Sequence, residues 1–180
     1  MKGMVFTEFL ELVERTWSPA MADDLVDACE LQSGGAYTSV GTYDHREMVK
    51  LVVELAARTG QRPDDVLHWF GGGLFGSLAA SFPRFVEGYA DALSMLAGIE
   101  AVIHVEVRKL YPDAELPVFE VSRQDARTLV LDYRSPRCMD ALAHGLIDAC
   151  VRQFGGGVQV RRAPLGPTHA DGSRFTLVRE

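Results

Sequence analysis

The sequence predicts an α+β fold in which several helices come first and strands then flank one late helix. Two observations carry this prediction. Apolar residues recur at helical spacing through the first half of the chain, and from Val118 onward short apolar runs with strand-like alternation take over. In a chain of 180 residues, this order is typical of one compact domain with an antiparallel sheet.

Four helices are predicted before residue 83. The second follows Pro19, and the third begins at Asp44–Glu47, which has the form of a capping box. Pro63 with two acidic residues after it suits the first turn of the fourth helix, and Phe82-Pro83 ends that helix. The apolar stripes of the first three helices are Val5, Phe9, Leu12 and Val13; Leu25, Val26 and Cys29; and Met48, Leu51, Val52 and Leu55.

Four strands are predicted in the second half, over residues 118–121, 129–133, 158–160 and 175–178. Three residues of the second strand fall on one face, because side chains two apart point the same way. They are Leu129, Leu131 and Tyr133. A helix lies between the second and third strands, is closed by three glycines at 155–157, and has the stripe Met139, Leu142, Ala143, Leu146, Ile147, Cys150 and Phe154.

The segment around His104 permits two interpretations. From Ile103 to Val107 apolar residues alternate as in a strand, yet apolar residues between Ile99 and Leu110 also share one helical face. Periodicity alone leaves both open.

The composition of the chain argues against several classes of function. A net charge of −7 argues against nucleic-acid binding, which depends on neutralising phosphates with Lys and Arg. No apolar run is long enough to cross a bilayer, and the acidic N-terminal segment does not resemble a signal peptide. The three cysteines lack a CxxC spacing, which indicates reduced thiols in a cytoplasmic protein and neither a disulfide framework nor a zinc site.

Three residues spaced by two, Tyr133, Ser135 and Arg137, predict an anion site. In an extended chain, which Pro136 favours at the residue before it, all three point to one face. Two hydroxyls and a guanidinium together can hold a carboxylate or a phosphate. On these residues alone, an edge strand that runs into a turn with an exposed arginine explains the pattern equally well.

A histidine amid apolar neighbours, such as His104, is more often a hydrogen-bonded core or surface residue than a metal ligand. Its neutral imidazole nevertheless suits the axial position of a haem iron. The other four histidines are scattered along the sequence and show no ligand pattern; they are His45, His68, His144 and His169.

Enzyme motifs are not supported. Gly71–Gly76 satisfies GxGxxG but follows a helical stripe instead of a strand, so close helix packing or a bend is the better interpretation. His104-Val105-Glu106 matches the HxE of zinc deaminases, but no PCxxC follows it. No GxSxG elbow of a serine hydrolase is present.

Taken together, several blocks of the chain resemble, in the same order, the haem-nitric oxide/oxygen binding (H-NOX) family. They span nearly the whole chain and include His104 and the Tyr133-x-Ser135-x-Arg137 pattern. The remaining blocks are Met1–Gly3, Tyr37–Tyr43, Phe82-Pro83 with Gly88-Tyr89, and Leu110–Pro117.

The resemblance implies one haem b per chain, buried between two parts of a single domain over residues 1–180. A helical distal part covers about residues 1–62 and a proximal part with the small sheet covers about residues 63–180. His104 would lie in a helix and ligate the iron, and the Tyr, Ser and Arg would hold the haem propionates. The implied pocket consists of Met1, Val5, Phe9, Leu74, Phe75, Pro117, Leu142 and Leu146.

The implied function is a gas sensor and not an enzyme. Oxygen-binding members of the family carry a tyrosine five residues after the arginine, where this chain has Leu142, and Phe9 and Leu74 occupy the supporting positions. NO and CO are therefore the expected ligands. Because no output domain follows in the sequence, the signal is expected to pass to a separate protein, such as a histidine kinase or a cyclic-di-GMP enzyme.

The chain departs from some family members in its cysteines, and a second function is compatible with its residues. Some family members carry a C-terminal cysteine cluster that binds zinc; this chain has no cysteine after Cys150, and His169 and Asp171 do not replace the cluster. The alternative function is a haem-free regulatory module that binds a small anion at Tyr133, Ser135 and Arg137. An absorption spectrum distinguishes the two functions.

Overall fold

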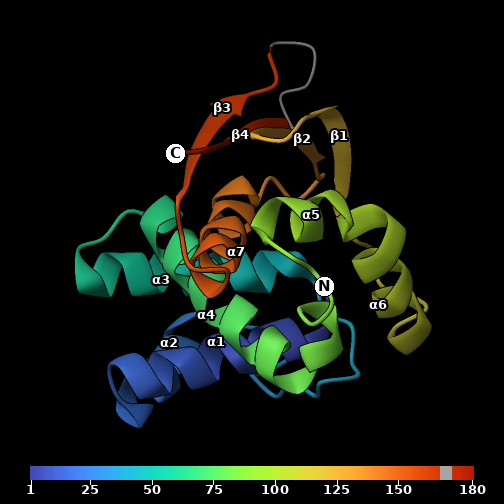
Figure 1. Ribbon diagram of the computed structural model, residues 1–180. Helices are drawn as coiled ribbons and strands as arrows, with labels where there is room; N and C mark the ends of the chain where they lie inside the picture. Colours follow the sequence, from blue (N-terminus) through green and yellow to red (C-terminus); the bar gives the residue numbers. More distant parts are fainter. Residues whose placement is uncertain (167–171) are drawn as a thin grey trace.

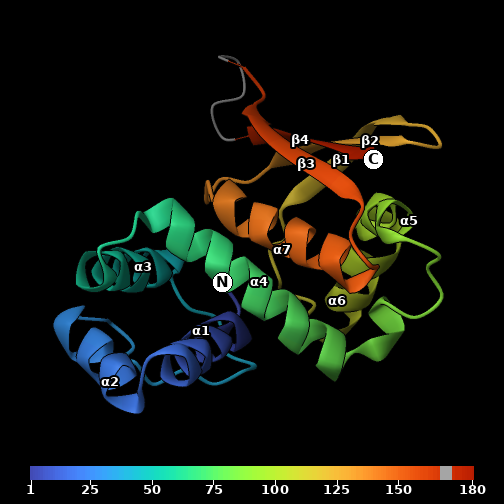
Figure 2. The same ribbon diagram turned by 60° about the vertical axis from the view of Figure 1, so that its left-hand side comes forward.

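A computed structural model describes residues 1–166 and 172–180. Figures 1 and 2 show a sheet on one side, α7 beneath it, and α1–α3 on the opposite side, with the long helix α4 running between them. The helices are α1 (Gly3–Thr16), α2 (Pro19–Ala28), α3 (His45–Thr59), α4 (Pro63–Ser81), α5 (Ala92–Ala97), α6 (His104–Leu110) and α7 (Asp140–Gln153), with a 3₁₀ turn at Pro83–Phe85 and a π-helical turn, η2, at Ile99–Ile103; the strands are β1 (Val118–Gln124), β2 (Thr128–Arg134), β3 (Val158–Pro164) and β4 (Gly172–Arg179).

The predicted α+β class is confirmed. Each helix predicted before residue 83 is present, and α4 runs from Pro63 to Ser81, as its N-terminal proline and the following Phe82-Pro83 indicate. The segment after Pro83 adds a short helix, α5, which is held by an Asp91–Ser94 capping box and was not predicted.

The sheet is antiparallel throughout, with strand order β1-β2-β4-β3. In the β2–β4 pair, Leu131 lies opposite Phe175 and Leu129 opposite Leu177, and all four side chains are fully buried. The predicted inward face of β2 is therefore confirmed. This face packs into one apolar cluster with Ile147 and other residues of α7.

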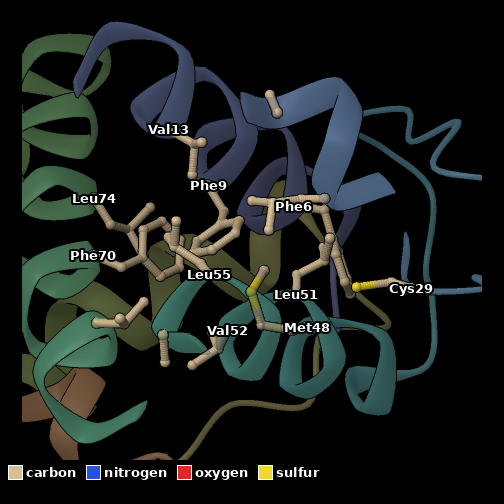
Figure 3. Packing of buried hydrophobic residues seen from close by; sticks show 14 of the residues in the cluster. Phe6, Phe9, Val13, Cys29, Met48, Leu51, Val52, Leu55, Phe70 and Leu74 are labelled. Atoms are coloured by element: carbon tan, nitrogen blue, oxygen red, sulfur yellow. The ribbon is translucent and has the colours of Figure 1, made fainter. Parts of the chain in front are cut away.

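Helix α4 belongs to both apolar clusters of the molecule. Phe70 and Leu74 pack with α1–α3 (Figure 3), whereas Phe75, next in sequence, packs with α7 and the sheet. The boundary between the distal and proximal parts was expected near residue 62, directly before α4. Because α4 packs with both parts, this boundary stays a proposal.

Helices α4 and α7 approach at glycines. A Cβ atom on Gly145 would lie 2.0 Å from the backbone oxygen of His68, and one on Gly71 would lie 2.3 Å from that of Leu142. Any larger residue would force the backbones apart. Part of the GxGxxG pattern thus serves close helix packing, one of the two interpretations offered above for Gly71–Gly76.

The predicted capping box at the start of α3 is only half right. Asp44 caps the helix by accepting from the backbone N–H of Arg46. Glu47 turns away and accepts instead from the backbone N–H and hydroxyl of Ser33, at 3.1 and 2.6 Å, and from the Tyr37 hydroxyl at 2.7 Å. Burial favours its protonated form, but these hydrogen bonds outweigh burial and lower the pKa of Glu47. Its carboxylate therefore anchors the loop before α3.

Among the described residues, no helix is both long and apolar enough to cross a membrane.

Candidate functional site

A cavity of about 570 Å³ lies between α1, α4, α7, the segment of η2 and α6, and the loop before β1. Its volume falls within the range of ligand pockets, about 300–1,000 Å³. Its wall is mostly apolar. The polar groups that reach it include the buried His104 and the partly buried Arg137.

His104 is the first residue of α6 and follows directly on the π-helical turn η2. The segment is helical, as the resemblance implied, and the strand interpretation is wrong. A π turn adds a residue to the helical repeat, so the apolar pattern here does not follow the 3.6-residue period alone and left both interpretations open. His104 is 8% exposed and lines the cavity.

Glu100, one turn earlier, fixes the imidazole of His104. The Nδ1–H group donates to Glu100 Oε1 at 2.9 Å, and the backbone N–H of Phe119 donates to the same oxygen at 2.8 Å. Because a carboxylate oxygen accepts, the ring proton lies on Nδ1 and the lone pair on Nε2. The turn η2, through Glu100, and strand β1, through Phe119, thus fix the orientation of the His104 ring.

Burial lowers the pKa of His104 below its ordinary value, although the carboxylate of Glu100 acts in the opposite direction. The imidazole is therefore neutral near pH 7, which is the form that ligates a metal.

Tyr133, Ser135 and Arg137 all line the same cavity as His104. The chain is not extended across all three, however. Strand β2 ends at Arg134, and the backbone N–H of Cys138 donates to the oxygen of Ser135 at 3.1 Å, which closes a turn with Pro136 at its second position. The expectation of an extended conformation is wrong after Ser135, because proline suits the turn equally well.

Arg137 already holds a carboxylate. Its guanidinium donates to the backbone oxygen of Glu115 at 2.8 Å and to Glu115 Oε2 at 2.5 Å. The Arg137 side chain is only 11% exposed, whereas that of Glu115 is 83% exposed. A largely sheltered cation is thus paired with a solvent-exposed carboxylate, an arrangement in which another anion can take the place of Glu115.

The residues expected in the pocket line this cavity, with one exception. Phe9 is fully buried, and its ring packs edge-on against Phe70 at 5.1 Å between centroids. Figure 3 shows it pointing into the cluster between α1, α3 and α4. Phe9 is therefore not among the residues that line this cavity, and its place against the haem stays a prediction. The residues found in the wall are Met1, Val5, Leu74, Phe75, Pro117, Leu142 and Leu146.

Three residues near the site escaped the sequence reasoning. Glu100 had one available signal, its i,i+4 spacing to His104. Phe119, whose ring lies 6.1 Å from that of His104 and 5.2 Å from that of Tyr133, reads only as a strand residue. Glu115 meets Arg137 through a turn whose shape the sequence did not specify.

The family assignment follows from sequence comparison. The profile of the haem-NO-binding family, HNOB, matches residues 2–162. The chain belongs to the haem-NO-binding family. No curated protein matches it.

Solved structures of H-NOX proteins resemble this chain over its whole length. The Fe(II) unliganded protein from K. algicida is 38% identical, with a TM-score of 0.93, and the match covers 100% of this chain and 97% of that one. An H-NOX protein from S. oneidensis in the Fe(II)NO state is 27% identical, with a TM-score of 0.91 and coverage of 100% and 99%. The IWP-051-bound H-NOX from Shewanella woodyi in the Fe(II)CO state is 38% identical, with a TM-score of 0.84 and coverage of 100% and 95%.

In this member of the haem-NO-binding family, the described residues that α1, α4 and α7 place in the wall carry no hydroxyl group. Among the residues that the structure describes, α1, α4 and α7 contribute only apolar side chains and the thiol of Cys150 to the wall. Burial raises the pKa of that thiol to about 12, and its Sγ lies 3.6 Å from Met95 Sδ. The wall from these helices comprises Met4, Val5, Leu74, Phe75, Leu78, Ala79, Leu142, Ala143, Leu146, Ile147 and Cys150.

The remaining histidines divide into three cases. His45 lies at the cavity, 3.6 Å from Asp44. His68 and His144 are not scattered, as their sequence positions indicated, because their ring centroids lie 5.0 Å apart. His169 and Asp171 fall outside the described residues, so the prediction that concerns them stays a prediction.

Proposed function

We propose that this chain binds one haem b in the cavity and serves as a sensor of NO, with CO as a second ligand. One observation carries the proposal: a buried, neutral His104, whose Nδ1–H is engaged by Glu100, lines an apolar cavity that Arg137 also lines. The family assignment and the NO- and CO-bound relatives support it.

The donor set fits haem. A haem needs one neutral nitrogen for its iron, apolar surroundings for its ring, and cationic or hydroxyl groups for two propionates. His104 supplies the nitrogen, and Arg137 with Tyr133 and Ser135 supplies the polar groups at another part of the same wall. That Arg137 pairs with the carboxylate of Glu115 supports its ability to hold a carboxylate.

Each residue then has a distinct role. When bound, haem would supply a ferrous iron that His104 ligates and that can also bind a diatomic gas. Glu100 orients the His104 ring and, by accepting its Nδ1–H, makes Nε2 a better donor. The side chains of Leu142 and Leu146 keep water out of the helical side. Nothing in this set acts as nucleophile or general base, and we propose a sensor and not an enzyme.

Arg137→Ala is expected to weaken haem retention. A charge-assisted hydrogen bond contributes about 1.5–3 kcal/mol, which corresponds to roughly 10- to 100-fold faster haem dissociation. Transfer to an apo-globin acceptor measures that rate. The matched control is Arg134→Ala, since Arg134 pairs with Glu120 and does not line the cavity. An unchanged transfer rate in Arg137→Ala would remove the propionate assignment.

Signalling follows from the position of His104 at the junction of η2 and α6. With haem bound, NO would favour, more strongly than CO, a state in which His104 is released from the iron. A ligand shifts a two-state segment only by its differential affinity for the two states. We therefore propose that NO, and CO only weakly, shifts η2 and α6 and so acts on a separate partner, such as a histidine kinase or a cyclic-di-GMP enzyme.

A reconstituted assay tests this proposal. A histidine kinase or cyclic-di-GMP enzyme chosen as the candidate partner is assayed with the ferrous protein alone, with NO and with CO, while absorption confirms that each gas is bound. We expect a large change of partner activity with NO and a small one with CO. Equal effects of the two gases would exclude His104 release as the switch.

A further inference from the structure

A cluster of three side chains that can ligate a metal lies outside the cavity, where α4 crosses α7. His68 Nε2 lies 2.8 Å from Asp148 Oδ2, and His144 Nε2 lies 3.7 Å from the same oxygen. All three potential ligand atoms lie within 4.8 Å of one another. Two imidazoles therefore converge on a single carboxylate oxygen.

The backbone brings these groups together rigidly. His144 and Asp148 are one turn apart on α7, and so project from one face of that helix. His68 comes from α4, at the point where its backbone oxygen touches Gly145. Because two glycines fix this crossing, the three ligand atoms are positioned by helices in direct contact and not by loops.

The spacing is close to that of a tetrahedral zinc site. Zinc binds histidine nitrogen and carboxylate oxygen at about 2.0–2.2 Å, which places neighbouring ligand atoms about 3.4 Å apart. Binding of an ion would open the 2.8 Å contact and shorten the 3.7 Å one, each by less than about 1 Å. Two imidazoles and one carboxylate are a donor set that zinc shares with cobalt and nickel.

We propose that His68, His144 and Asp148 bind a divalent transition-metal ion of the zinc type, with a fourth position left to water. Each of the three is only partly exposed, with 39%, 24% and 25% of its side chain accessible, so an ion has a path to the site and partial shelter within it. The guanidinium of Arg162, whose charge acts on His144, pairs with Asp64 at 3.0 Å and with Asp140 at 3.5 Å.

The site is separate from the cavity, because none of its three residues lines the cavity wall. Its helices nevertheless carry Leu74 and Leu142 of that wall on other faces. A bound ion thus ties α4 to α7 behind the pocket. The ligands are also unrelated to the cysteines, of which Cys138 alone is exposed.

Zinc binding to tag-free protein tests the proposal, with or without haem. The chain is incubated with Zn²⁺, passed through gel filtration, and its zinc content and affinity are measured by elemental analysis and calorimetry. We expect one ion per chain. His68→Gln and Asp148→Asn should each weaken binding by at least about 10-fold, the lower range for losing even an outer-sphere partner. Asp148→Asn keeps an acceptor for His68 and should preserve the fold, which circular dichroism checks.

The controls are His45→Gln and Cys138→Ser, which should leave zinc affinity unchanged. Zinc X-ray absorption adds a readout that needs no variant: the expected ligands are nitrogen and oxygen, with imidazole scattering. The proposal is overturned if the chain retains no zinc, if His68→Gln and Asp148→Asn bind as tightly as the unmodified chain, or if sulfur appears among the ligands. The cluster would then be a hydrogen-bonded helix contact alone.

Discussion

The His104→Gly variant is expected to lose haem or to hold it only when imidazole is added. Among the described residues that line the cavity, His104 is the buried histidine whose ring is fixed by a carboxylate and whose Nε2 is left for a metal. Without it the iron has no protein ligand, and the apolar wall and Arg137 alone hold the ring. Added imidazole fits the space left by the side chain and should restore a ferrous spectrum like that of the unmodified protein.

His45→Gly is the matched control, because His45 also lines the cavity but has its Nδ1 3.6 Å from the partly exposed Asp44 and not beside Glu100. Its spectrum and haem content should match those of the unmodified protein. If His104→Gly keeps an unchanged ferrous spectrum without imidazole, or if His45→Gly loses haem instead, the ligand has been assigned to the wrong residue.

The ferrous protein is expected to bind NO and CO and to form no lasting O₂ complex. Bound O₂ carries partial negative charge and needs a hydrogen-bond donor, whereas NO and CO need one much less. Leu142 stands where oxygen-binding relatives are expected to carry a tyrosine, and the described residues of α1, α4 and α7 in the wall offer no hydroxyl. Absorption spectra recorded in air over time measure the outcome.

The Leu142→Tyr variant tests whether an added hydroxyl lets the protein keep bound O₂. The new hydroxyl should lengthen the lifetime of the oxygenated spectrum, whereas Leu142→Phe, which adds the same ring without the hydroxyl, should not. A long-lived O₂ spectrum in the unmodified protein would mean that another donor reaches the gas and would contradict the assigned role of the apolar wall.

The spacing of apolar residues, and the prolines that begin or end helices, predicted much of the fold. The alternation of Leu129, Leu131 and Tyr133 defined the buried face of β2, and Pro63 with Phe82-Pro83 bounded α4. Patterns with period two or 3.6 could not resolve the segment before His104, because its π turn follows neither. There the resemblance of whole blocks to a family decided correctly for a helix.

Contacts between distant residues were the part that the sequence could not supply. Glu47 looked like the far half of a capping box but bonds Ser33 and Tyr37, since a loop brought back onto α3 offers it three donors. Phe9 shares the stripe of α1 but faces the core. His68 and His144 are brought together only because glycines let α4 and α7 touch.

The haem content of the purified chain tests the central claim most directly. The full chain is purified, supplied with haem under reducing conditions, passed through gel filtration, and measured for absorption and for haem per chain. We predict a ferrous Soret band with one haem per chain that shifts on addition of NO. A folded, colourless protein that retains no haem, and instead binds a small carboxylate or phosphate in an Arg137-dependent manner, would contradict the account and identify the cavity as an anion-binding module.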